Sequence, residues 1–172
     1  MNILVGSHGV GKSTLMKRVQ KHFPEYYCTD GFSRPLREAS IKLGLLPLQE
    51  QILIGELTAW SWTSNLTRKK YLSTRSIIDP IVYSAVLGYE SESKRLEKIW
   101  QDNLDMAREA RYFYIPIEFP VEDDGVRFTD EKFRKEVDIQ LINFLNKYDI
   151  RYFVLNGPVE QRFDRISFLL KA

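Results

Sequence analysis

Apolar and polar positions follow two periods along this chain, and the two kinds of segment alternate. Short runs rich in β-branched and aromatic residues are typical of strands, and they occupy residues 2–5, 26–29, 71–74, 112–117 and 152–155. Between them apolar residues recur at steps of three and four, as from Leu48 to Leu66 and from Phe133 to Tyr148, which predicts helices. The alternation predicts an α/β fold with a five-stranded parallel sheet covered by helices on both faces.

The bulk composition narrows the class of protein only slightly. With 172 residues, 44% hydrophobic and 28% charged, the chain is ordinary for one globular domain, and we predict a single domain over residues 1–172. The net charge of +2 is too small to indicate nucleic-acid binding by itself, and a single cysteine excludes an internal disulfide. No apolar run approaches the roughly 20 residues of a membrane span. We therefore expect a cytoplasmic protein without a membrane anchor or an obligate protein partner.

The first predicted strand leads into the stretch GSHGVGKST. It satisfies the pattern G-x-x-x-x-G-K-[ST], in which glycines let successive N–H groups curl around one phosphate and the next helix adds its N-terminal dipole. This predicts a P-loop NTPase fold that binds ATP with Mg²⁺. Lys12 is expected to reach the β- and γ-phosphates, and the Ser13 hydroxyl to bind the metal. The predicted nucleotide contacts are Gly6, His8, Gly9, Val10, Gly11, Lys12, Ser13 and Thr14.

Two fates of the bound phosphate are disfavoured. A GTPase switch needs N-K-x-D after a strand and D-x-x-G elsewhere, but NKYD at 146–149 ends a helical pattern and D-x-x-G is absent. A motor or AAA-type ATPase has an acid at the end of an apolar strand, whereas the candidate strand at 71–74 is followed by Arg75 and ends in Thr74. Transfer to a second substrate fits best.

Phosphoryl transfer calls for an acid, arginines and a closing loop. Asp30 follows the second strand and is our first choice for the base, with a turn or helix-capping role as the alternative. Asp79 is a second acid, either a helix cap or a ligand on the metal side. The expected arginines are Arg34, Arg75, Arg127 and Arg134, and a solvated surface position is the alternative for Arg75, Arg127 and Arg134. Arg127 and Arg134 flank the long polar loop at 118–131.

On these residues, and on the stretches STRSIIDPIVYS, DDGVRFTDEKFRKEVD and LNGPVEQR, the chain resembles the nicotinamide-riboside-kinase-like ATPases and the wider nucleoside and nucleotide kinase group. The resemblance implies a lid at about 118–131 and an acceptor-site insertion at about 31–70. It also implies that Asn156, Gly157 and Pro158 pack against adenine. One position departs from the family pattern: Thr74 stands where an acid is usual before Arg75.

The sequence leaves the phosphate acceptor open. A free nucleoside or nucleotide suits a closed pocket, whereas a hydroxyl within DNA suits an open groove with basic walls, for which residues 67–70, Arg34 and Arg37 are suggestive. By resemblance alone the second alternative points to a phage enzyme that modifies DNA bases. A non-nucleotide acceptor and a non-catalytic ATP sensor complete the alternatives. Trp60 and Trp62 are predicted to pack in the core, with a stacking role in the acceptor pocket as the alternative.

Overall fold

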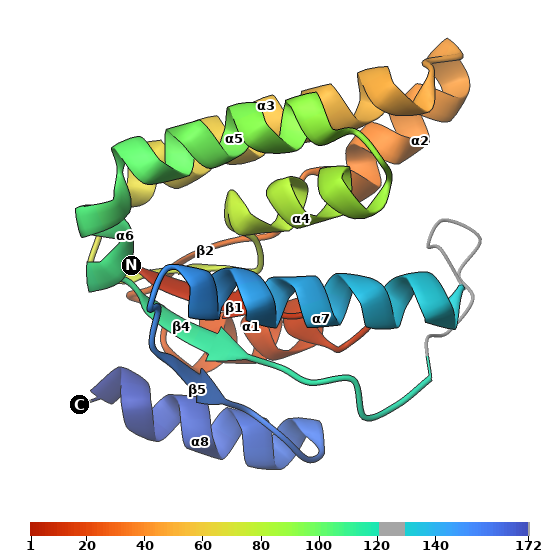
Figure 1. Ribbon diagram of the computed structural model, residues 1–172. Coiled ribbons are helices and arrows are strands. Elements are labelled where there is room, and N and C mark those ends of the chain that lie inside the picture. The colour runs from red at the N-terminus through yellow and green to blue at the C-terminus, as the bar shows by residue number, and fades with distance from the viewer. Residues whose placement is uncertain (121–129, 172) are drawn as a thin grey trace.

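Five short strands form one sheet in the order β2-β3-β1-β4-β5, and every neighbouring pair is parallel (Figure 1). The computed structural model describes residues 1–120 and 130–171. The strands are β1 (Asn2–Val5), β2 (Tyr27–Thr29), β3 (Tyr71–Ser73), β4 (Arg111–Tyr114) and β5 (Tyr152–Val154). β1 is buried at all four positions because strands flank it on both sides and helices cover both faces. The predicted α/β fold with a five-stranded parallel sheet is confirmed.

Eight helices connect and cover these strands in the described part of the chain. They are α1 (Lys12–His22), α2 (Ser33–Leu43), α3 (Pro47–Asn65), α4 (Ile78–Val86), α5 (Glu90–Asp102), α6 (Leu104–Glu109), α7 (Glu131–Lys147) and α8 (Val159–Lys171). Helices α2 and α3 lie between β2 and β3, within the range 31–70 that the sequence assigns to an acceptor-site insertion. None of the helices in residues 1–120 and 130–171 is long and apolar enough to cross a membrane.

The two faces of the sheet are covered by different helices (Figure 1). On one face α3, α4, α5 and α7 build a core in which Trp62 and Trp100 stack with ring centroids 5.3 Å apart. On the other face α1 and α8 pack against the sheet through residues such as Leu15 and Ile166. Burial of these apolar side chains on both sides of a parallel sheet is the main contribution to the stability of such a fold.

The two tryptophans of α3 have opposite environments. Trp62 is 1% exposed and lies in the core, as predicted, whereas Trp60 is 68% exposed and the prediction for it is wrong. Residues i and i+2 of a helix are about 200° apart around its axis, so the rings of Trp60 and Trp62 cannot both face the same core. Neither ring lines the cavity described below.

The basic run at 67–70 lies at the amino end of β3, since that strand begins at Tyr71. The phosphate-binding loop follows the carboxyl end of β1, and β1 and β3 are parallel. Lys69 and Lys70 therefore lie at the amino ends of the strands, whereas the loop lies at their carboxyl ends. The length of the strands separates these lysines from Arg34 and Arg37, which line the cavity beside the loop.

Candidate active site

The phosphate-binding loop joins β1 to α1 in a conformation that requires glycine. Gly6 and Gly11 have φ values of 146° and 94°, in the region that side-chain-bearing residues rarely adopt. A Cβ atom on Gly6 would also lie 2.4 Å from the carbonyl oxygen of Ile115, at the end of the neighbouring chain segment after β4. The loop is therefore fixed by the spacing of its glycines, and α1 begins at Lys12 with its N-terminus at the loop.

Lys12 is folded back onto this loop. Its Nζ donates hydrogen bonds to the carbonyl oxygens of Gly6 at 2.5 Å and of Ser7 at 2.7 Å. Burial, reinforced by the positive charge of Arg75, lowers the pKa of Lys12 well below its ordinary value, although nearby carboxylates act in the opposite direction. A buried ammonium whose charged form is disfavoured gains most from an anion, so the loop is suited to a polyphosphate.

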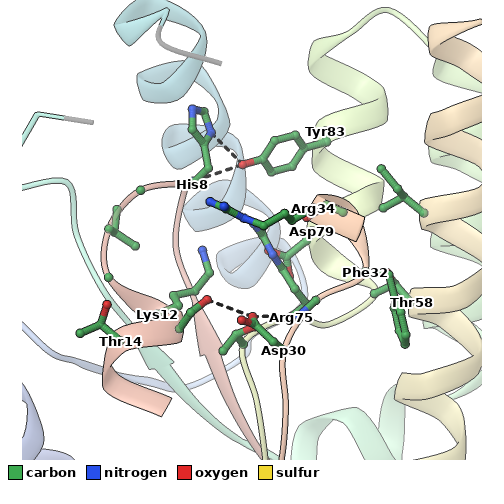
Figure 2. A pocket seen from close by; sticks show the side chains of 18 of the residues that line it. His8, Lys12, Thr14, Asp30, Phe32, Arg34, Thr58, Arg75, Asp79 and Tyr83 are labelled. Carbon is green, nitrogen blue, oxygen red and sulfur yellow. Dashed lines mark hydrogen bonds and ion pairs between the residues drawn. The ribbon is translucent and has the colours of Figure 1, made fainter. Parts of the chain in front are cut away.

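A cavity of about 680 Å³ opens beside the loop, at the carboxyl ends of the strands. This volume lies in the range of small-molecule sites. The loop forms one wall, and α2, α3 and α4 form the opposite wall (Figure 2). The lining residues include His8, Gly9, Val10, Gly11, Lys12, Ser13, Thr14, Asp30, Phe32, Arg34, Arg37, Gln51, Thr58, Thr74, Arg75, Asp79 and Tyr83. The structure thus brings most of the predicted site residues to one place.

Asp30 lies directly against the phosphate-binding loop. Its Oδ1 accepts hydrogen bonds from Ser13 Oγ at 3.0 Å, from Thr74 Oγ1 at 2.5 Å and from the backbone N–H of Gly31 at 2.9 Å. Partial burial alone would raise the pKa of Asp30, but the hydrogen bonds from Thr74, Ser13 and Gly31 outweigh it and hold this pKa below its ordinary value. The group is an ionised carboxylate at neutral pH.

Arg75 and Asp79 form an ion pair at the wall of the cavity (Figure 2). Arg75 Nη1 donates to Asp79 Oδ1 at 2.7 Å, and the backbone N–H of Ser76 donates to Asp79 Oδ2 at 2.9 Å. Asp79 lies in the first turn of α4, whose N-cap residue is Ile77. Its hydrogen bond with Arg75 holds that side chain in one orientation. Burial alone would lower the pKa of Arg75, but Asp79 and Tyr83 outweigh it and raise that pKa, so the guanidinium stays charged.

Gly31 is the reason that Arg75 can take this position. A Cβ atom on Gly31 would lie 2.4 Å from Arg75 Cγ. The contact is at the base of the Arg75 side chain and not at its flexible end, so a larger residue at position 31 cannot be accommodated by a small shift of the guanidinium.

Arg134 is in α7 and does not line the cavity. It is fully buried, and its guanidinium donates to the carbonyl oxygens of His8 at 3.0 Å and Phe119 at 2.9 Å. Arg134 therefore ties the phosphate-binding loop to the segment after β4. Its buried position differs from the exposed position expected of a lid arginine. Arg127 lies outside the described residues.

Arg162 was not singled out by sequence reasoning, yet it lines the cavity. Its Nη1 donates to the carbonyl oxygen of Val10 at 2.6 Å, and its Nη2 donates to Glu118 at 2.7 Å. Glu118 in turn accepts from the backbone N–H of Gly157 at 2.8 Å. Arg162 therefore links the phosphate-binding loop to the loop after β5.

The predicted adenine contacts, Asn156, Gly157 and Pro158, adjoin the cavity without lining it. Val159, the first residue of α8, is the lining residue next to them. Their role against a base stays a prediction.

The parallel sheet, the glycine loop and the cavity at the strand tips define a P-loop NTPase fold of the nucleotide-kinase type. The chain belongs to a family described as an AAA domain, whose sequence profile matches residues 2–162. A search of curated proteins gave no match.

Several solved structures share the fold. Deoxyadenosine kinase from M. mycoides, solved with dCMP and dCDP, is 15% identical with a TM-score of 0.70, and the match covers 99% of both chains. Thymidylate kinase from Candida albicans is 11% identical with a TM-score of 0.69, covering 99% of this chain and 90% of that one. The YorR protein of Bacillus subtilis, solved with phosphorylated GDP, is 13% identical with a TM-score of 0.58, covering 99% and 95%.

The family matched is described as an AAA domain, although the strand at 71–74 lacks the acid on which the sequence analysis disfavoured a motor or AAA-type ATPase activity. An acid after β3 is therefore not required for membership. The lack of that acid still bears on the chemistry of the site, since Thr74 takes its position.

Proposed function

We propose that this protein is an ATP-dependent phosphotransferase that moves the γ-phosphoryl group from ATP to a nucleoside- or nucleotide-type acceptor. The observation that carries the proposal is a single cavity with a phosphate-binding loop on one wall and the α2–α3 insertion on the other. Donor and acceptor can thus meet within one cavity, and most of the rate enhancement in phosphoryl transfer comes from such positioning together with electrostatic stabilisation.

The donor side is built by the loop and α1. The backbone N–H groups of the loop and the N-terminus of α1 face the phosphates, and Lys12 leaves its carbonyl partners to pair with the β- and γ-phosphates. The Ser13 hydroxyl and the Asp30 carboxylate, in contact at 3.0 Å, are the hard oxygen donors that suit Mg²⁺. When bound, this ion neutralises charge that develops on the transferred group.

The acceptor side is built by α2, α3 and α4. Arg75, oriented by Asp79, and Arg34, from the first turn of α2, project toward the space in front of the loop (Figure 2). There they stabilise the negative charge of the migrating phosphoryl group. Phe32 and Gln51 also line the cavity, and their ring and amide suit the face and the polar edge of a base. Gln51 Nε2 is held by Ser84 Oγ at 3.1 Å.

A free acceptor is favoured over a hydroxyl within DNA. The site is a cavity of small-molecule size, and Arg37, one of its basic residues, is paired with Glu50 at 3.1 Å. Lys69 and Lys70 lie at the opposite edge of the sheet from the phosphate-binding loop, so they do not extend this cavity into a basic groove.

The test is transfer of radiolabelled γ-phosphate from ATP with Mg²⁺ to a panel of nucleosides, nucleoside monophosphates, nicotinamide riboside and DNA with normal or hydroxymethylated bases. Label on a small acceptor is the expected result, and Lys12→Ala should abolish it while the exposed Lys17→Ala on the same helix does not. Label on polymer alone would instead support a DNA kinase. Tight ATP binding without label on any acceptor would support the sensor.

A further inference from the structure

The tip of β3, the strand beside β1, carries no carboxylate. In P-loop enzymes the cation is held by the loop hydroxyl and by an acid at the tip of a nearby strand. Here β3, the neighbour of β1, ends in Ser73 and is followed by Thr74, neither of which carries a charge. A carboxylate must come from elsewhere if the site binds Mg²⁺ in the usual manner.

Asp30 reaches that position from the tip of β2, one strand further from β1. Its Oδ1 is bonded to both residues that mark the position: the loop hydroxyl, Ser13, and the strand-tip residue, Thr74. We propose that Asp30 is the carboxylate of the magnesium site, in place of the acid missing from β3, and that Thr74 positions it by donating a hydrogen bond. This inference rests on the proposed function, and it assigns Asp30 to the metal side instead of to the role of base.

Thr74 is thereby a partner of Asp30. Because Thr74 Oγ1 lies 2.5 Å from the Asp30 carboxylate, an acid at position 74 would place two negative charges in contact. A hydroxyl at the same position donates a hydrogen bond and holds the carboxylate in one orientation. The adjoining tips of β2 and β3 therefore have room for one carboxylate, and here Asp30 supplies it while Thr74 supplies the hydroxyl.

Asp79 is less suited to the cation. One of its oxygens accepts from Arg75 and the other from the backbone N–H of Ser76, and the residue is only 3% exposed. The guanidinium neutralises its charge locally. Residues 1–120 and 130–171 contain no group of three or more His, Cys, Asp or Glu side chains that could bind a metal ion. A single carboxylate together with the loop hydroxyl, water and nucleotide phosphates agrees with the usual coordination of Mg²⁺.

The experiment measures ATP binding by calorimetry with Mg²⁺ and with EDTA, so the readout does not depend on turnover. Asp30→Asn keeps the shape of the side chain and removes its charge. We expect the gain in affinity that Mg²⁺ gives the wild type to fall at least tenfold in Asp30→Asn, with ATP binding in EDTA unchanged or tighter. Adding Thr74→Asp to that variant returns a carboxylate to the tip of β3 and should restore the gain.

Two controls separate the alternatives. Asp105→Asn removes an exposed acid away from the cavity and should leave the gain unchanged. Asp79→Asn should also retain the gain, whereas its loss there, with retention in Asp30→Asn, would overturn the inference and assign the cation to Asp79. Loss in Asp30→Asn without rescue by Thr74→Asp would overturn the shared position of the two residues. A wild-type chain that binds no ATP at all overturns the proposed function itself, so the two failures are distinguishable.

Discussion

Replacing Gly31 by alanine tests whether the position of Arg75 controls the reaction. In Gly31→Ala the new Cβ would lie 2.4 Å from Arg75 Cγ, and 3.3 and 3.4 Å from its Nε and Cδ. The side chain of Arg75 must rotate from its base, which breaks the 2.7 Å hydrogen bond to Asp79. An off-rotamer side chain costs about 1 kcal/mol, and a hydrogen bond between charged groups contributes about 1.5–3 kcal/mol.

Taking about 2 kcal/mol as the effect on the transition state, kcat/KM for the acceptor should fall about 30-fold. ATP affinity, measured by calorimetry, should change little, because the loop and Lys12 are not displaced. The double variant Gly31→Ala/Arg75→Ala should be no slower than Arg75→Ala, since the glycine acts through the arginine. A Gly31→Ala enzyme with wild-type kcat/KM, or losses that add in the double variant, would refute this reasoning.

Three further predictions concern the donor side and the core. Bound phosphates should raise the lowered pKa of Lys12, so ATP binding takes up protons and affinity falls as the pH rises from that lowered pKa toward the ordinary value of about 10.4; calorimetry in two buffers of different ionisation enthalpy measures the uptake, and equal heats in both would contradict it. Arg162→Ala, which removes a charged hydrogen bond to the phosphate-binding loop, should weaken ATP binding about tenfold or more, whereas exposed Arg165→Ala on the same helix should have no effect in the same titration. In urea denaturation Trp62→Ala should cost about 3–5 kcal/mol and Trp60→Ser less than about 0.5 kcal/mol, and equal losses would show that the two rings are not placed as described.

The elements of the fold were predictable because periodicity reports burial. Each strand and long helix of the sequence analysis recurs in the structure, and their ends differ by a few residues, as at β4, which ends at Tyr114. Polarity and periodicity gave conflicting signals at the two buried arginines. Arg134 is three residues before buried Val137, and Arg162 is four residues before buried Ile166, so both occupy the inward face of their helices. Helical phase could have identified both as buried residues.

The contacts of the site were less accessible to sequence reasoning. The glycine loop identified the phosphate site because backbone geometry dictates its residues. The contact between Asp30 and Thr74 depends on the pairing of β2 with β3, through Thr29 and Ser73. The local sequence does not show which strands become neighbours. The presence of Thr74 in place of an acid is therefore explained only by the sheet order, which puts β2 beside β3.

The fate of the γ-phosphate is the measurement that tests the central proposal most directly. Labelled ATP is incubated with the wild-type chain, Mg²⁺ and each small acceptor, and the label is partitioned between ATP, inorganic phosphate and acceptor. The proposed phosphotransferase predicts ADP formation that depends on the acceptor, with the label recovered on the acceptor. Release of the label as inorganic phosphate at a rate independent of any acceptor would contradict it.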